Sequence, residues 1–114
     1  RAMVNARALL LFAEANSGLT RLLTGEALCL EGTQVRESMQ RCLAKAEKAL
    51  CASLELAVVQ REVAADINPV VRARLIMSYV QGRWARFVAS GFEEKPTEDW
   101  AQAQVILFSD LVSA

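Results

Sequence analysis

Histidine is absent from this chain of 114 residues, so the side chain most often used for acid–base catalysis and metal binding is missing. The three cysteines, Cys29, Cys42 and Cys51, form no CxxC pair and have no metal-ligand spacing. Without histidine, a serine or cysteine nucleophile needs a lysine or carboxylate base, and no such pairing stands out. Loop solvation and helix capping explain the acidic residues within 93–99. We therefore predict no catalytic residue, no metal site and no cofactor, and we do not expect an enzyme.

Neither sign of charge dominates, because 13 Lys and Arg residues balance 13 Asp and Glu residues along the chain. A segment that neutralises DNA phosphates carries a basic stripe, and none is found here. No uncharged run of about 20 residues and no signal peptide pattern occurs, which argues against a membrane span. An odd number of cysteines among apolar residues indicates reduced core thiols in a cytoplasmic protein. A redox or ligand-sensing thiol is the alternative.

Proline and aromatic residues are scarce, whereas hydrophobic residues make up 54% of the chain and alanine and leucine abound. This composition, without any strand pattern, predicts a single all-α domain of five or six helices. The expected helices cover residues 1–15, 17–24, 33 to about 60, 69–90 and 97–112, with a further apolar turn at 26–31. The first helix begins without a cap, which we interpret as the continuation of a longer chain.

Capping residues predict where the helices begin. Thr33 is expected to cap the long third helix, and Thr97 to cap the last one, with Glu98 and Asp99 in its first turn. The apolar face predicted for the long helix consists of Val35, Met39, Cys42, Ala46, Ala49, Leu50, Ser53 and Ala57.

The run from Asn68 to Phe92 predicts the helix around which the other helices are organised. Asn68 is a good N-cap, and Pro69 suits the first helical position. At about 100° per residue the run has two apolar faces. One is large: Ile76, Met77, Val80, Trp84, Phe87 and Val88. The other is small: Ser78, Gly82, Ala85 and Ala89.

A helix that is apolar on two sides must bury both sides. A chain this short supplies packing partners for only one of them, so the second is expected to pack against another subunit. Glycine within a helix costs about 1 kcal/mol relative to alanine, so Gly82 indicates the close approach of a partner backbone. We predict a homodimer in which the last two helices form an antiparallel pair and join those of a partner in an intermolecular four-helix bundle. The predicted interface residues are Ser78, Gly82, Ala85, Ala89, Trp100, Gln104, Leu107, Phe108 and Leu111.

The large apolar residues allow two interpretations. Phe12, Met77, Trp84 and Phe87 either line a pocket for a small apolar ligand or fill the core. The sequence leaves both open.

Two local strings resemble a known family. Residues 16–28 read NSGLTRLLTGEAL, and residues 86–100 read RFVASGFEEKPTEDW. Together with the predicted helix pair they are similar to the C-terminal domains of TetR-family regulators, and within that family to the nucleoid occlusion factors. The chain departs from the family pattern at Leu11, Ala15 and Ser17, where a glycine, a basic residue and a proline are usual.

The resemblance implies a TetR-type C-terminal dimerisation and regulatory domain spanning residues 1–114. It implies that a helix-turn-helix domain missing from this chain binds chromosomal DNA, and that the DNA-bound protein engages FtsZ and blocks septum assembly over the nucleoid. The implied location is cytoplasmic and nucleoid-associated. The family's partner groove lies near the end of the helix before the N-x-G turn, so Glu14 and Asn16 are the candidate partner-binding residues. The alternatives are a TetR-type transcriptional repressor that senses a small ligand, and a free-standing helical scaffold.

Overall fold

The computed structural model describes residues 2–24, 33–61 and 66–108. The helices are α1 (Ala2–Ala15), α2 (Ser17–Leu23), α3 (Thr33–Val59), α4 (Pro69–Ala89) and α5 (Trp100–Phe108). No strand occurs within these three described ranges. The prediction of an all-α fold with five or six helices is confirmed for them, while the apolar turn predicted at 26–31 lies outside the described residues.

Local signals determine both ends of α4. The Asn68 side-chain oxygen accepts hydrogen bonds from the backbone N–H groups of Val70 (3.0 Å) and Val71 (3.2 Å), so Asn68 is the N-cap that the sequence predicts. At the other end, Gly91 has a φ of 67°, and the Phe92 N–H donates to the Phe87 carbonyl at 2.8 Å. This is a Schellman motif, and the Phe87–Phe92 ring pair, with centroids 5.2 Å apart, is the apolar contact that accompanies it.

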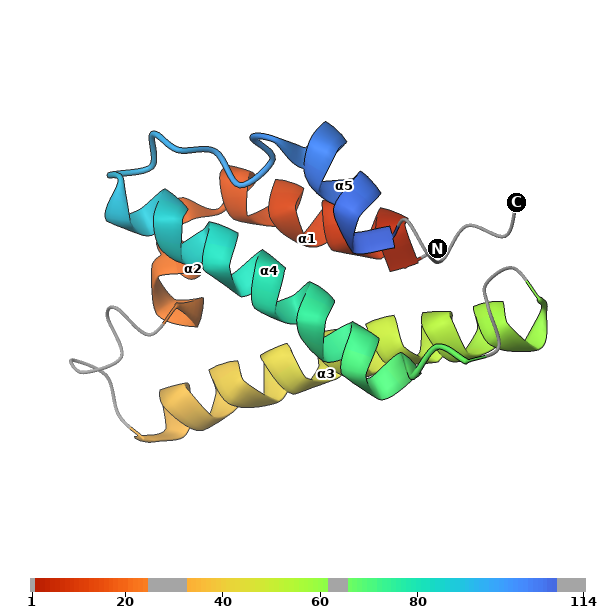
Figure 1. Cartoon of the computed structure of the whole chain (residues 1–114). Coiled ribbons are helices and arrows are strands. Elements are labelled where there is room, and N and C mark those ends of the chain that lie inside the picture. The colour runs from red at the N-terminus through yellow and green to blue at the C-terminus, as the bar shows by residue number, and fades with distance from the viewer. Residues whose placement is uncertain (1, 25–32, 62–65, 109–114) are drawn as a thin grey trace.

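Helix α4 runs through the middle of the molecule and contacts α1, α2 and α3, as Figure 1 shows. Helix α5 packs on α1 and reaches α4 through side chains. The rings of Tyr79 and Trp100 lie 6.2 Å apart, and Arg72 Nη1 donates to the Leu107 carbonyl at 3.1 Å. An arginine at this position complements the negative end of the α5 dipole.

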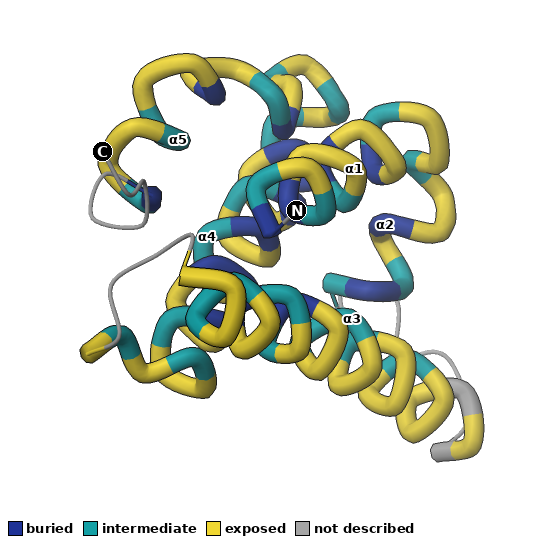
Figure 2. Tube along the Cα trace, turned by 90° about the vertical axis from the view of Figure 1, so that its right-hand side faces the viewer, coloured by how far each residue is buried: buried dark blue, intermediate teal, exposed yellow. Residues whose placement is uncertain are grey.

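The core lies where α1, α3 and α4 face one another, and Figure 2 shows buried positions along these inner sides. Its members are Ala2, Ala6, Leu10, Ala13, Leu23, Leu50, Leu54, Ala73, Ile76, Met77, Val80, Trp84, Trp100 and Phe108. The molecule measures only 18 Å along its shortest axis, about the thickness of two packed helices. Each described helix therefore keeps an outer side that the other described helices do not cover.

The apolar face predicted for α3 is wrong in part. Leu50 and Leu54 are 0% and 1% exposed, whereas Cys42 and Ala49, which the prediction placed on the inner face, are exposed. Apolar residues extend around more than one side of α3, and packing against α1 and α4 selects the side that carries Leu43, Leu50 and Leu54. The core-thiol prediction therefore fails for Cys42, while Cys51 is half-buried and Cys29 lies outside the described residues.

The predicted start of the last helix is also wrong. Helix α5 begins at Trp100, and the Asp99 carbonyl accepts from the N–H groups of Gln102 (3.1 Å) and Ala103 (2.8 Å). Glu98 and Asp99 therefore precede the helix instead of lying in its first turn. Thr97 does not cap it, because its hydroxyl donates to Glu14 on α1.

Candidate functional site

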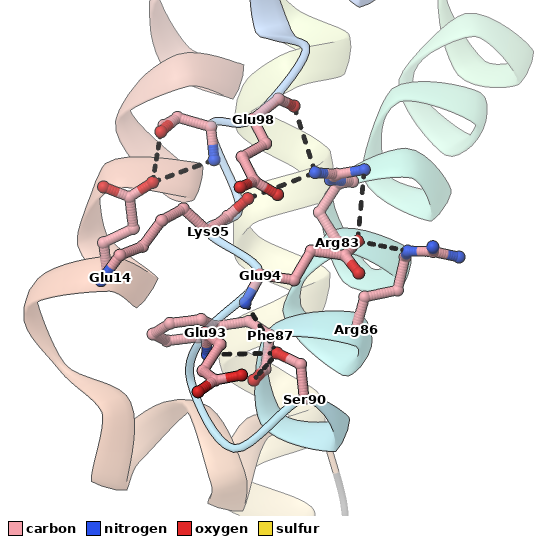
Figure 3. Close-up of polar contacts among 10 residues, drawn as sticks. Glu14, Arg83, Arg86, Phe87, Ser90, Glu93, Glu94, Lys95 and Glu98 are labelled. Carbon is pink, nitrogen blue, oxygen red and sulfur yellow. Dashed lines mark hydrogen bonds and ion pairs between the residues drawn. The ribbon is translucent and has the colours of Figure 1, made fainter.

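The second of the two strings, residues 86–100, contacts the end of α1, just before the first string begins. One Glu14 side-chain oxygen accepts a hydrogen bond from the Thr97 N–H at 2.9 Å and another from the Thr97 hydroxyl, as Figure 3 shows. Glu14 is only partly exposed, and this oxygen already accepts two hydrogen bonds within the protein. The carboxylate predicted to bind a partner therefore fastens the α4–α5 loop to α1.

Two arginines of α4 hold the same loop from the other side. Arg83 Nη2 donates to the carbonyls of Lys95 (3.2 Å) and Glu98 (3.1 Å), and Arg83 Nη1 lies 3.7 Å from a Glu94 carboxylate oxygen. Arg86 Nε donates to that same oxygen of Glu94. The hydrogen bond from Arg86, together with the charges of both arginines, holds the pKa of Glu94 below its ordinary value. The loop between α4 and α5 is thus held by contacts to both α1 and α4.

Replacing Glu14 tests whether this anchor stabilises the fold. In Glu14→Ala the partly buried Thr97 donors lose their charged acceptor, so we expect the free energy of unfolding to fall by about 1.5–3 kcal/mol. Glu14→Gln keeps an amide oxygen and should lose about half as much. Urea denaturation of both variants measures the difference, and Glu93→Ala, which removes an exposed carboxylate of the same loop, is the control. Equal stability of Glu14→Ala and Glu93→Ala would show that Glu14 does not anchor the loop.

Asn16 occupies the corner between α1 and α2 and is exposed. It stands at the N-cap of α2 without a side-chain capping bond, because its amide nitrogen donates back to the Phe12 carbonyl at 2.9 Å. The corner is also held by Thr20, a fully buried residue whose hydroxyl lies 2.8 Å from the Asn16 carbonyl and 3.3 Å from the Ala13 carbonyl. The sequence analysis did not single out Thr20, although it belongs to the string NSGLTRLLTGEAL.

The outer side of α4 is uncovered over its whole length. Its members, which we call the outer α4 face, are spaced four, three, four, three and four residues apart, and all are exposed: Val71, Leu75, Ser78, Gly82, Ala85 and Ala89. Val71 is 55% and Leu75 is 53% exposed. A Cβ atom added to Gly82 would meet no atom within 4 Å. Nothing packed on Gly82 within the described chain therefore accounts for a glycine in the middle of this helix.

The residues predicted on α5 are divided between the inside and the edge of the protomer. Trp100 and Phe108 are 7% and 3% exposed and contact each other, with ring centroids 6.5 Å apart. Gln104 and Leu107 are half-buried, and Leu111 lies outside the described residues. Val105 and Ile106 of α5 are exposed, at 62% and 78%.

The residues of the predicted ligand pocket differ in burial. Met77, Trp84 and Phe87 are 1–2% exposed, and Trp84 Nε1 donates to the Leu9 carbonyl at 3.1 Å, which ties α4 to α1. Phe12 is 39% exposed, on the surface of α1. Three of the four residues are thus buried, and the fourth is exposed.

The described residues hold neither a metal-binding cluster nor a membrane-spanning helix. There, no group of three or more Cys, Asp or Glu side chains is placed to hold a metal ion. No helix in ranges 2–24, 33–61 and 66–108 has the length and apolar character needed to cross a membrane.

Comparison with known families gives a match over almost the whole chain. The SlmA-like family model described as "Tetracyclin repressor-like, C-terminal domain" matches residues 2–112. The Nucleoid occlusion factor SlmA of Idiomarina loihiensis is 32% identical over 106 residues, covering 93% of this chain and 54% of that protein. That of Shewanella sediminis is 30% identical over 106 residues, with the same shares of 93% and 54%.

A third relative, the Nucleoid occlusion factor SlmA of Shewanella loihica, is 34% identical over 94 residues, covering 82% of this chain and 48% of that protein. The chain thus spans about half the length of the curated relatives that it matches. Neither the family description nor the relatives' names is that of an enzyme, in agreement with the prediction. The resemblance recognised in the sequence is confirmed.

Proposed function

Because this chain belongs to the SlmA-like family of tetracyclin repressor-like C-terminal domains, we propose that it is the dimerisation and regulatory domain of a nucleoid occlusion factor. Pairing of two chains would hold two DNA-binding domains at a fixed separation across a palindromic site. Residues 1–114 carry no basic stripe, so we assign DNA contact to a domain outside them. We further propose that this nucleoid occlusion factor acts in the cytoplasm and inhibits FtsZ-ring assembly over the nucleoid.

The outer α4 face is the observation that carries the dimer. It is a continuous seam of small and apolar side chains along a helix of 21 residues. Small residues at alternating spacings of three and four allow two helices to approach closely. Within the described protomer, no packed neighbour requires a glycine at position 82. A partner backbone packed against Gly82 would explain a residue that costs about 1 kcal/mol of helix stability relative to alanine.

Helix α5 extends this proposed interface. Its exposed residues Val105 and Ile106 offer further apolar area. Trp100 and Phe108, buried against α1 and α4, would support the interface from behind, with Gln104 and Leu107 at its edge. Two copies of α4 and α5 related by a two-fold axis would form the intermolecular four-helix bundle.

The proposed FtsZ contact lies at the corner between α1 and α2. Leu11, Phe12 and Leu19 are 40%, 39% and 37% exposed there, with exposed Ala15 and Asn16 among them. Exposed apolar side chains close in sequence to an exposed amide suit a short peptide segment that carries apolar side chains. We propose that Asn16 contacts the peptide directly and that Glu14 acts indirectly, by holding the α4–α5 loop beside it.

Two measurements test these proposals separately. Sedimentation equilibrium of the chain should give the mass of a dimer at micromolar concentration, and a monomer at all concentrations would contradict the dimer. In fluorescence anisotropy, a labelled FtsZ C-terminal peptide should bind the chain, and Asn16→Ala should weaken binding by about five- to tenfold. Gln40→Ala, an exposed amide on α3, is the matched control. A dimer that binds no peptide would support the family fold and contradict FtsZ binding by this chain.

A further inference from the structure

A groove of about 560 Å³ lies along α3 beside the start of α4, the two helices that cross below the centre of Figure 1. Its apolar wall is formed by Ala44 and Cys51 of α3 and by Val70 and Ala73 of α4. Residues 41 to 51 of α3 span about 15 Å along the helix axis. The groove is thus long, mostly apolar and within the size range of small-ligand sites.

The groove's charged residues are mainly basic. Arg41, Lys45 and Lys48 line it from positions about one helical turn apart, and Glu47 is the single acidic residue among its described lining. Lys45 and Lys48 form no ion pair with any residue of the described ranges. Three cations and one anion leave a net charge of +2 beside an apolar wall, which favours a ligand that is apolar along its length and anionic at its head.

We propose that this groove binds the anion of a free fatty acid, with the chain against Ala44, Val70 and Ala73 and the carboxylate near Lys45 and Lys48. A helical peptide about 10 Å wide is too broad for the volume, and a flat bilayer surface does not reach Ala73, which is fully buried at the base. None of the groove's described lining residues belongs to the outer α4 face. This inference goes beyond the proposed role in nucleoid occlusion and does not depend on it.

Cys51 provides a reporter inside the groove, and Cys42 provides one outside it. Cys51 lines the groove and is half-buried, and its thiol donates to a Glu55 carboxylate oxygen at 3.8 Å. Burial and the charge of Glu55 raise its pKa, so labelling is best done at pH above about 8.5. Cys42, nine residues earlier on the same helix, is exposed and is not among the described lining residues.

The first experiment follows iodoacetamide labelling of the full chain by peptide mass spectrometry, with and without dodecanoate. Dodecanoate at ten times its dissociation constant should slow labelling of Cys51 about tenfold and leave the rate of Cys42 nearly unchanged. Equal protection of both thiols, or of neither, would overturn the proposal. Dodecyltrimethylammonium, which has the same chain and a cationic head, should protect neither thiol.

The second experiment measures dodecanoate affinity by calorimetry, below the concentration at which the ligand forms micelles. The double variant Lys45→Gln/Lys48→Gln should bind about tenfold more weakly, whereas Arg7→Gln, an exposed cation on α1, should bind like the unmodified chain. Flotation with phosphatidylglycerol vesicles distinguishes a free acid from a membrane surface. Capture by the vesicles without binding of free dodecanoate would overturn the proposal, as would unchanged affinity of the double variant.

Discussion

Gly82→Leu should convert the chain from a dimer into a stable monomer. Within the protomer a Cβ atom at Gly82 meets no atom within 4 Å, so this helix position has room for a side chain to begin. Leucine also has a higher helix propensity than glycine, so the free energy of unfolding of the monomer should rise by roughly 0.8–1 kcal/mol. At the proposed seam the same side chain would separate two closely packed helices. Overpacking costs typically about 1–3 kcal/mol per site, and two-fold symmetry places the substitution twice in the interface.

The expected result is an increase in the dimer dissociation constant by a factor of about 30 or more. Sedimentation velocity over a range of protein concentrations measures it, and urea denaturation of the separated monomer measures the gain in protomer stability. Gln81→Leu is the matched control, since it adds leucine to an exposed position next to Gly82 that is outside the outer α4 face. If the Gly82→Leu and Gln81→Leu variants have the same dimer dissociation constant, the outer α4 face is not the interface.

Trp84→Ala should have the largest effect on folding. Trp84 is 2% exposed and packs in the core with Leu10, Ile76 and Val80. Truncating a buried tryptophan removes its apolar contacts and leaves a cavity, which typically costs about 3–5 kcal/mol. For a domain of this size that loss lowers the melting temperature by roughly 12 °C or more. Thermal and urea unfolding at one fixed protein concentration measure both quantities, since dimer stability depends on concentration.

Phe12→Ala is the control that separates the two interpretations of the predicted ligand pocket. Phe12 is 39% exposed, so its truncation should cost less than about 1 kcal/mol. If both side chains lined one open pocket, Trp84→Ala and Phe12→Ala would have similar, small effects on stability. A small effect of Trp84→Ala would therefore contradict its role in the core and favour the pocket.

Several features of the fold follow from residues that are close together in the sequence. Asn68 and Pro69 predict the start of α4, because an N-cap satisfies donors only two and three residues away. Gly91 predicts the end of α4, because the left-handed residue of a Schellman motif favours glycine. The large apolar face of α4 also follows from its spacing, and Ile76, Val80 and Trp84 are buried as expected.

Other features depend on contacts between distant residues, which local sequence patterns do not identify. Thr97 is a suitable N-cap, yet its hydroxyl and N–H both donate to Glu14, which is 83 positions away. Cys42 and Leu43 are both compatible with an apolar face of α3, and neighbouring helices decide that Leu43 packs against the core while Cys42 is exposed. The groove between α3 and α4 has no signal in the sequence, because its walls come from two helices whose approach only packing determines.

The sequence by itself determined the helical class, the limits of α4 and the family, since capping, periodicity and local motifs act over a few residues. It also indicated the seam of Ser78, Gly82, Ala85 and Ala89, since one helix period places them on one side. Only the tertiary structure decided that Glu14 anchors the α4–α5 loop and that Trp100 and Phe108 turn inward. The reason is physical. One side chain can often make either a local contact or a distant contact of similar free energy, and the packing of the whole chain selects between the two.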